Sequence, residues 1–224
     1  PNRNSEVVAQ FIYNPQNPEN PKKNYWNKET GEVIIDDFTE GNLKSTIDNT
    51  TGNYSSQDVQ MITVAGKIGG SDFSVTRDFS NCTLIDMSRT SGIDNVPSYA
   101  FYNTNVENVY LPSCIEKIGY RTFAGCKSLS AITLYAMTPP EVDKETFYEA
   151  NEGFVVYVPA SALARYQADK TWGEFNLMPI QDDIHALQVS LPQGTDAKVY
   201  SQMWIELTNT KSGQKMHYVM TGRD

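Results

Sequence analysis

The sequence has few of the residues that carry most enzyme chemistry. Its 224 residues include only two histidines and three cysteines. The cysteines, Cys82, Cys114 and Cys126, form neither an even disulfide framework nor a CxxC pair, which argues against a disulfide-stapled domain and a zinc site. The chain contains no nucleophile elbow, HExxH pair, P-loop or dinucleotide fingerprint. We therefore expect a protein without catalytic residues, metal or cofactor.

Positive charge and long apolar runs are also scarce. Lysine and arginine number 18 against 27 acidic residues, which gives a net charge of −9, and no basic cluster is present. Such a surface repels nucleic acid and anionic membranes. No apolar run approaches the roughly 18 residues of a membrane-spanning helix. A hydrophobic content of 39% nevertheless suffices for a core, so wholesale disorder is not expected.

The remaining candidates for chemistry have simpler interpretations. His185 and His217 lie in a terminal β-rich segment with no nucleophile motif nearby, which favours a strand surface or a satisfied core imidazole. The doublets at 36–37 and 182–183 are acidic pairs at element boundaries, where aspartate usually caps a helix or turn. A hydrolase is the least supported class of function.

What the sequence does contain is a repeat of about 23 residues. Each unit reads apolar-x-x-apolar-x-apolar, and the middle positions are spaced 23, 24, 23 and 24 residues apart. The three rows are Val59, Cys82, Val106, Leu129 and Gly153; Ile62, Ile85, Val109, Ile132 and Val156; and Val64, Met87, Leu111, Leu134 and Val158. One unit cannot bury such a strand face alone, so stacked units should form a parallel sheet of strands paired in sequence order.

A second ladder runs beside the first. Four β-branched residues are each followed five residues later by phenylalanine, namely Ile68, Val96, Ile118 and Val142, then Phe73, Phe101, Phe123 and Phe147. We expect the phenylalanines to stack as the opposite wall of the core, beneath short helical or irregular segments. Ile93, Ile115 and Pro139 form a further row. The fold class is therefore a repeat solenoid.

Several motifs resemble the BspA-like bacterial leucine-rich repeats. They are the IG-x-x-x-F step, AGCKSL, and the closing PPEVDKETFYEANEGFVVYVPASALARYQADKTWGEF. The resemblance covers roughly residues 57–180; the shortened loop at Thr104-Asn105 and the break at Gly153 depart from it. It implies a leucine-rich-repeat solenoid with a short helical or irregular convex side. It also implies a surface or secreted protein of host-associated bacteria with an adhesin-like role.

Three regions are expected along the chain. Residues 1–56 form a turn-rich N-terminal segment, and residues 57–182 form the repeat solenoid with its C-terminal cap. Residues 183–224 form a β-rich segment, which is either an incomplete Ig-like module or a small add-on sheet. In the last segment, alternating apolar residues predict strands around 187–191, 205–207 and 216–220, with TKSG as a turn.

Caps are expected at both ends of the solenoid, because an open end exposes core and sheet edge. Residues 25–35 predict a hairpin, residues 42–47 a short helix and residues 159–170 one helix. Trp172, Phe175 and Ile180 should then seal the last phenylalanine row.

The residues between ladder positions should face away from the core, and we expect a partner to bind there. The candidate partner-binding residues are Tyr110, Tyr135, Tyr157, Asp86, Asn108 and Thr133. Tyrosine offers a large contact area at low entropic cost. Strand propensity alone also places tyrosine on such surfaces, so this alternative stays open.

The leading function is a non-enzymatic, adhesin-like module that binds host or neighbouring proteins outside the cell. A glycan-binding accessory protein and a structural spacer are the alternatives; a flat, co-facing pair of exposed aromatic rings would favour glycan. The chain starts at Pro1 without a signal segment, so we expect a mature or trimmed piece, and an upstream lipoprotein anchor is compatible with it. The ligand, the oligomeric state and any continuation beyond Asp224 stay open.

Overall fold

The computed structural model describes residues 24–52, 57–143, 145–180, 195–201, 204–209 and 215–219. These residues fall into two compact units, one within Lys22–Ile180 and one within Gln181–Asp224. Each unit is described by itself.

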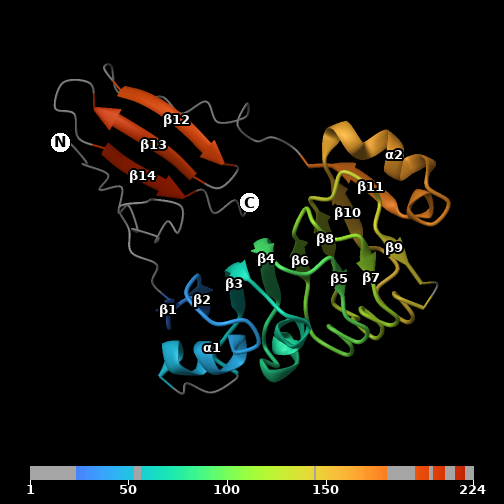
Figure 1. The fold of residues 1–224 in the computed structure, drawn as a ribbon, viewed down its shortest axis with the longest axis horizontal. Coiled ribbons are helices and arrows are strands. Elements are labelled where there is room, and N and C mark those ends of the chain that lie inside the picture. Colours follow the sequence, from blue (N-terminus) through green and yellow to red (C-terminus); the bar gives the residue numbers. More distant parts are fainter. Residues whose placement is uncertain are drawn as a thin grey trace, which may run out of the picture. The chain divides into compact units, whose positions relative to one another are not determined.

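The larger unit is built on one eight-stranded sheet in the order β1-β2-β3-β4-β6-β8-β10-β11 (Figure 1). The strands are β1 Tyr25–Asn27, β2 Glu32–Ile35, β3 Met61–Lys67, β4 Leu84–Ser91, β6 Asn108–Leu111, β8 Ala131–Leu134, β10 Val155–Val158 and β11 Asn176–Pro179. From β2 to β11 every neighbouring pair is parallel, whereas β1 and β2 form an antiparallel hairpin. The predicted parallel pairing in sequence order is confirmed.

The register of the sheet follows the ladder read from the sequence. The middle row pairs residue by residue across β3, β4, β6, β8 and β10, from Ile62 to Val156. These side chains are 0–1% exposed and form the centre of the core. The third row shifts at its first step, because the pairing of β3 with β4 slips between Thr63 and Ala65.

The sheet gains a strand at each end that the period does not predict. Val33 on β2 pairs with Ile62, an interval of 29 residues, and Leu177 on β11 pairs with Val156, an interval of 21. The predicted hairpin at 25–35 is present as β1 and β2. Its second strand also continues the main sheet, on the N-terminal side of the boundary predicted at residue 56, and the three regional boundaries stay predictions.

A second, small parallel sheet lines the opposite wall. Its strands are β5 Asn95–Val96, β7 Lys117–Ile118 and β9 Glu141–Val142, in that order. The 3₁₀ segment η1, Gly70–Asp78, lies at the corresponding place after β3. The sequence predicts only helical or irregular segments on this side, so the small sheet is a correction. Its strands are two residues long, too short to produce an alternating pattern.

The phenylalanines stack as predicted. The Phe123 side chain is fully buried, and its ring lies 5.0 Å from Phe101 and 5.5 Å from Phe147, with interplanar angles of 19° and 8°. Phe73 contacts Phe101 edge-on at 6.4 Å. The row thus runs through four successive turns of the chain.

At the C-terminal end of the repeats, Trp172 closes the core. Its Nε1 donates a 2.7 Å hydrogen bond to the Pro140 carbonyl, and its ring lies 6.2 Å from Phe147. The predicted helix over 159–170 is shorter and begins as a 3₁₀ turn: η2 covers Ala160–Ala162 and α2 covers Leu163–Ala168, followed by η3 at Trp172–Glu174.

At the N-terminal end, α1 spans Leu43–Thr51, four residues longer at its C-terminal end than predicted. It buries Leu43 and Ile47 completely and ends at Gly52, whose φ of 67° suits glycine as a helix stop.

The C-terminal unit contains a three-stranded antiparallel sheet in the order β12-β13-β14. The strands are β12 Thr195–Ser201, β13 Trp204–Asn209 and β14 Lys215–Val219. The latter two lie where residues 205–207 and 216–220 predict strands. The expected strand at 187–191 and the TKSG turn lie outside the described residues, and the Ig-like assignment stays a prediction.

Phe123→Ala should lower the free energy of unfolding by about 3–5 kcal/mol, because the change leaves a cavity in the middle of the ring stack. Urea denaturation followed by circular dichroism measures this loss. Tyr102, one residue beyond the row and 38% exposed, provides the matched control, and Tyr102→Ala should be mild. An unchanged urea midpoint for Phe123→Ala would contradict the assignment of the row to the core.

Asp72 links the start of α1 to the start of η1 at the N-terminal end of the larger unit. Its buried carboxylate accepts backbone hydrogen bonds from Gly41 (2.8 Å), Leu43 (3.1 Å) and Gly69 (2.8 Å). Asp72→Ala leaves these three N–H donors without an acceptor and should lower the free energy of unfolding by about 2–4 kcal/mol. Asp78 is exposed, so Asp78→Ala should lower it little. Equal urea midpoints for the two variants would show that the carboxylate does not hold the segments together.

Candidate partner-binding surfaces

The outer face of the main sheet carries two columns of side chains, as predicted from strand alternation. One column is Met61, Leu84, Asn108, Ala131 and Val155, and the other is Thr63, Asp86, Tyr110, Thr133 and Tyr157. Every step in both columns is a direct cross-strand pair. The sheet thus places a mostly apolar column beside one that holds two tyrosines.

The predicted site residues differ in how much surface they offer. Asn108, Tyr110, Tyr135 and Tyr157 are half-buried and remain available to a partner. Asp86 and Thr133 are buried, with 6% and 7% of their surface exposed. These two residues lie on the predicted face but expose little contact area, and their role in binding stays a prediction.

The burial of Asp86 and Thr133 follows from their neighbours. Thr133 lies between Tyr110 and Tyr157 in register, so a larger side chain flanks it on each side. The Asp86 carboxylate accepts a 2.8 Å hydrogen bond from the Ser88 backbone N–H and is near enough to Tyr135 to affect its ionisation. Small side chains on this face are therefore covered by tyrosines.

Tyr135 lies beside this column rather than in it. Burial raises the pKa of its phenol to about 12, and the charges of Asp86 and Tyr110 contribute in the same direction. The neutral form of Tyr135 is therefore strongly favoured at physiological pH, and its grouping with Tyr110 and Tyr157 stays a prediction.

A second group of exposed tyrosines was not predicted from the sequence. Tyr99, Tyr102, Tyr120 and Tyr148 lie on the turns that follow β5, β7 and β9 and are 37–49% exposed. We call them the turn tyrosine cluster. Tyr99 contacts Tyr102 at 5.5 Å and Tyr120 at 5.6 Å between ring centroids. The available signal was that these four tyrosines each lie one to three residues after a position of the second ladder.

No cluster of metal-ligating side chains is found in the part of the chain that the structure describes. No group of three or more His, Cys, Asp or Glu side chains that could hold a metal occurs among these residues. The thiols of Cys82 and Cys126 are buried, and burial raises the pKa of both, to about 12 for Cys82, while Cys114 is an exposed free thiol. His185 and the side chain of His217 lie outside the described residues. None of the described helices is long and apolar enough to cross a membrane.

Comparison with known families identifies the repeats. Residues 75–159 match the BspA type leucine rich repeat region in six copies. Residues 75–159 are therefore BspA-type leucine-rich repeats, in agreement with their motifs and with the mostly parallel sheet. No curated protein matches the chain.

Tyr135→Phe should alter the response of stability to alkaline pH. Because the folded state raises the pKa of this phenol from 10.0 to about 12, its contribution is fully present below pH 10 and is lost as the pH rises to 12. The parent's free energy of unfolding should therefore fall more steeply over this interval than that of Tyr135→Phe. Urea denaturation at several pH values tests this, and parallel slopes would contradict the assigned environment.

Proposed function

We propose that this protein is a non-enzymatic, adhesin-like module that binds a host or microbial surface protein through the outer face of its main sheet. In this proposal the repeats form a solenoid, and Tyr110, Tyr135 and Tyr157 are the central contact residues. The observation that supports it is the cross-strand register, in which Tyr110 and Tyr157 share one column on either side of Thr133.

The composition of this face favours a protein partner. The neighbouring column supplies half-buried Met61, Leu84, Ala131 and Val155, so apolar surface adjoins the tyrosines. Aromatic residues with adjoining apolar area are typical of the centres of protein interfaces. The parallel strands hold these side chains in place before binding, which lowers the entropic cost of association.

A glycan partner is less favoured by the ring geometry. Stacking of a sugar is expected from flat, co-facing aromatic rings, whereas the exposed pairs Tyr99–Tyr102 and Tyr99–Tyr120 cross at 82° and 80°. A structural spacer would need no partner. Loss of binding in the variant described below would therefore favour a protein-binding module over a spacer.

An extracellular or cell-surface location belongs to the same proposal. BspA-like repeat proteins are typically surface or secreted proteins, and the net charge of −9 suits a protein that does not bind nucleic acid. No catalytic step is part of this proposal.

The test is a triple variant, Tyr110→Ala with Tyr135→Ala and Tyr157→Ala, with its fold verified by circular dichroism. Its binding to immobilised extracellular-matrix proteins should weaken by about tenfold or more relative to the parent. Tyr25→Ala, an exposed tyrosine on β1, is the matched control and should leave binding unchanged. Unchanged binding by the triple variant would rule out the sheet face, and binding of the parent only to a glycan array would favour the alternative.

A further inference from the structure

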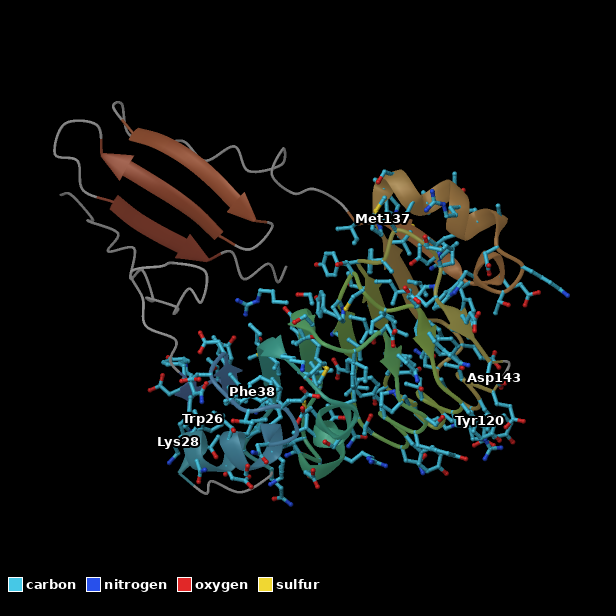
Figure 2. All side chains as sticks on the ribbon, in the orientation of Figure 1. Trp26, Lys28, Phe38, Tyr120, Met137 and Asp143 are labelled. Carbon is cyan, nitrogen blue, oxygen red and sulfur yellow. The ribbon has the colours of Figure 1, made fainter. Side chains whose placement is uncertain are left out.

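The turn tyrosine cluster is the main concentration of exposed apolar surface on the described residues. Seven large hydrophobic side chains are exposed among these residues, and four of them are Tyr99, Tyr102, Tyr120 and Tyr148. Clustered exposed aromatic residues on a folded domain commonly mark an interaction site. In Figure 2, Tyr120 lies at the edge of the repeat region, well away from Met137.

Backbone hydrogen bonds between successive turns hold this cluster in place. The Tyr99 N–H donates to the Tyr120 carbonyl at 3.0 Å, and the Gly125 N–H donates to the Tyr148 carbonyl at 2.9 Å. Tyr99 and Arg121 both have positive φ angles, 61° and 51°. This backbone conformation is uncommon for residues other than glycine, and it sets the direction of both side chains. The rings are thus presented by a hydrogen-bonded frame rather than by a free loop.

The cluster already binds one arginine of this chain. The Arg121 guanidinium lies 5.3 Å from the Tyr120 ring centroid and 5.0 Å from that of Tyr148, within cation–π range. Its Nε and Nη2 contact Glu145 Oε2 at 2.8 and 2.7 Å. This geometry shows that the tyrosine faces and a nearby carboxylate together accommodate a guanidinium.

The rings of Tyr99 and Tyr102, the other two residues of the cluster, are different in this respect. Among the described residues no cation lies over the ring of Tyr99 or Tyr102, although both rings are 38% exposed. The cluster therefore offers further aromatic surface for a cation.

The surrounding charge favours a cationic partner. Three cations on β7 and the turn after it are all paired with acids one repeat further on, in Lys117–Glu141, Arg121–Glu145 and Lys127–Glu149. Exposed Asp143, which Figure 2 places near Tyr120, forms no ion pair among the described residues. The whole chain carries −9, which attracts a positive partner at long range.

We infer that the turn tyrosine cluster is a second binding surface that takes a protein segment bearing exposed arginines, with one guanidinium over the ring face of Tyr99 or of Tyr102. Arginine fits better than lysine because its planar guanidinium packs against aromatic rings, as the Arg121 guanidinium does beside Tyr120 and Tyr148. This surface is separate from the sheet face and does not depend on it.

The experiment measures binding of a short fluorescein-labelled peptide of alternating glycine and arginine to the full chain by fluorescence anisotropy. Tyr99→Leu and Tyr102→Leu keep an apolar side chain and the net charge but remove the ring. Each should weaken binding by about two- to fivefold, whereas the Tyr99→Phe and Tyr102→Phe variants, which keep the ring, should bind as the parent does. Tyr25→Leu is the control for an exposed tyrosine elsewhere and should have no effect.

Because leucine changes no charge, general attraction of the peptide to an acidic protein stays constant across the series. Equal binding by the parent and the leucine variants would overturn the inference, as would equal binding of a citrulline peptide, which lacks the positive charge. Loss of oligosaccharide binding in the same variants, without loss of peptide binding, would assign the cluster to glycan instead. The triple variant of the sheet face should bind the peptide normally, so the two surfaces are tested independently of each other.

Discussion

Backbone hydrogen bonding between successive parallel strands is the constraint on which the rest of this structure depends. A slip of one residue between two strands would move every side chain of one strand to the opposite face. The row from Ile62 to Val156 can therefore be buried only because each turn of the chain returns in the same register. The tyrosine column follows directly from that return, since Tyr110 and Tyr157 each lie one residue after a residue of the row.

The sequence predicts the fold well where the period is constant and poorly where it is not. The five central strands were recognisable because the intervals vary by a single residue. β2 and β11 belong to the same sheet but lie 29 and 21 residues from their neighbours, so their rows do not align in a search at a fixed period. β5, β7 and β9 have two residues each, which leaves no alternation to detect. Their pairing is a consequence of the stack, not of local sequence.

On the candidate surfaces, the sequence indicates which way a side chain points but not how deeply its neighbours bury it. Alternation along a strand correctly predicts that Asp86 and Thr133 face away from the core, but their burial depends on the size of side chains on adjacent strands. The residues of the turn tyrosine cluster do not share one position of the repeat. Tyr99 and Tyr102 lie three and six residues after Val96, and Tyr120 lies two residues after Ile118, so only the folded turns bring them together.

The two edges of the main sheet differ in their ability to recruit another strand. At one edge β1 is three residues long and runs antiparallel, so a further repeat cannot extend the parallel series from it. At the other edge, the Ile180 N–H points inward to the Val158 carbonyl, so the adjacent Pro179 occupies an outward-facing position and has no N–H to donate. Short edges and edge prolines are features that discourage intermolecular strand pairing. In the part of the chain that the structure describes, both edges of the main sheet therefore disfavour pairing with a second copy.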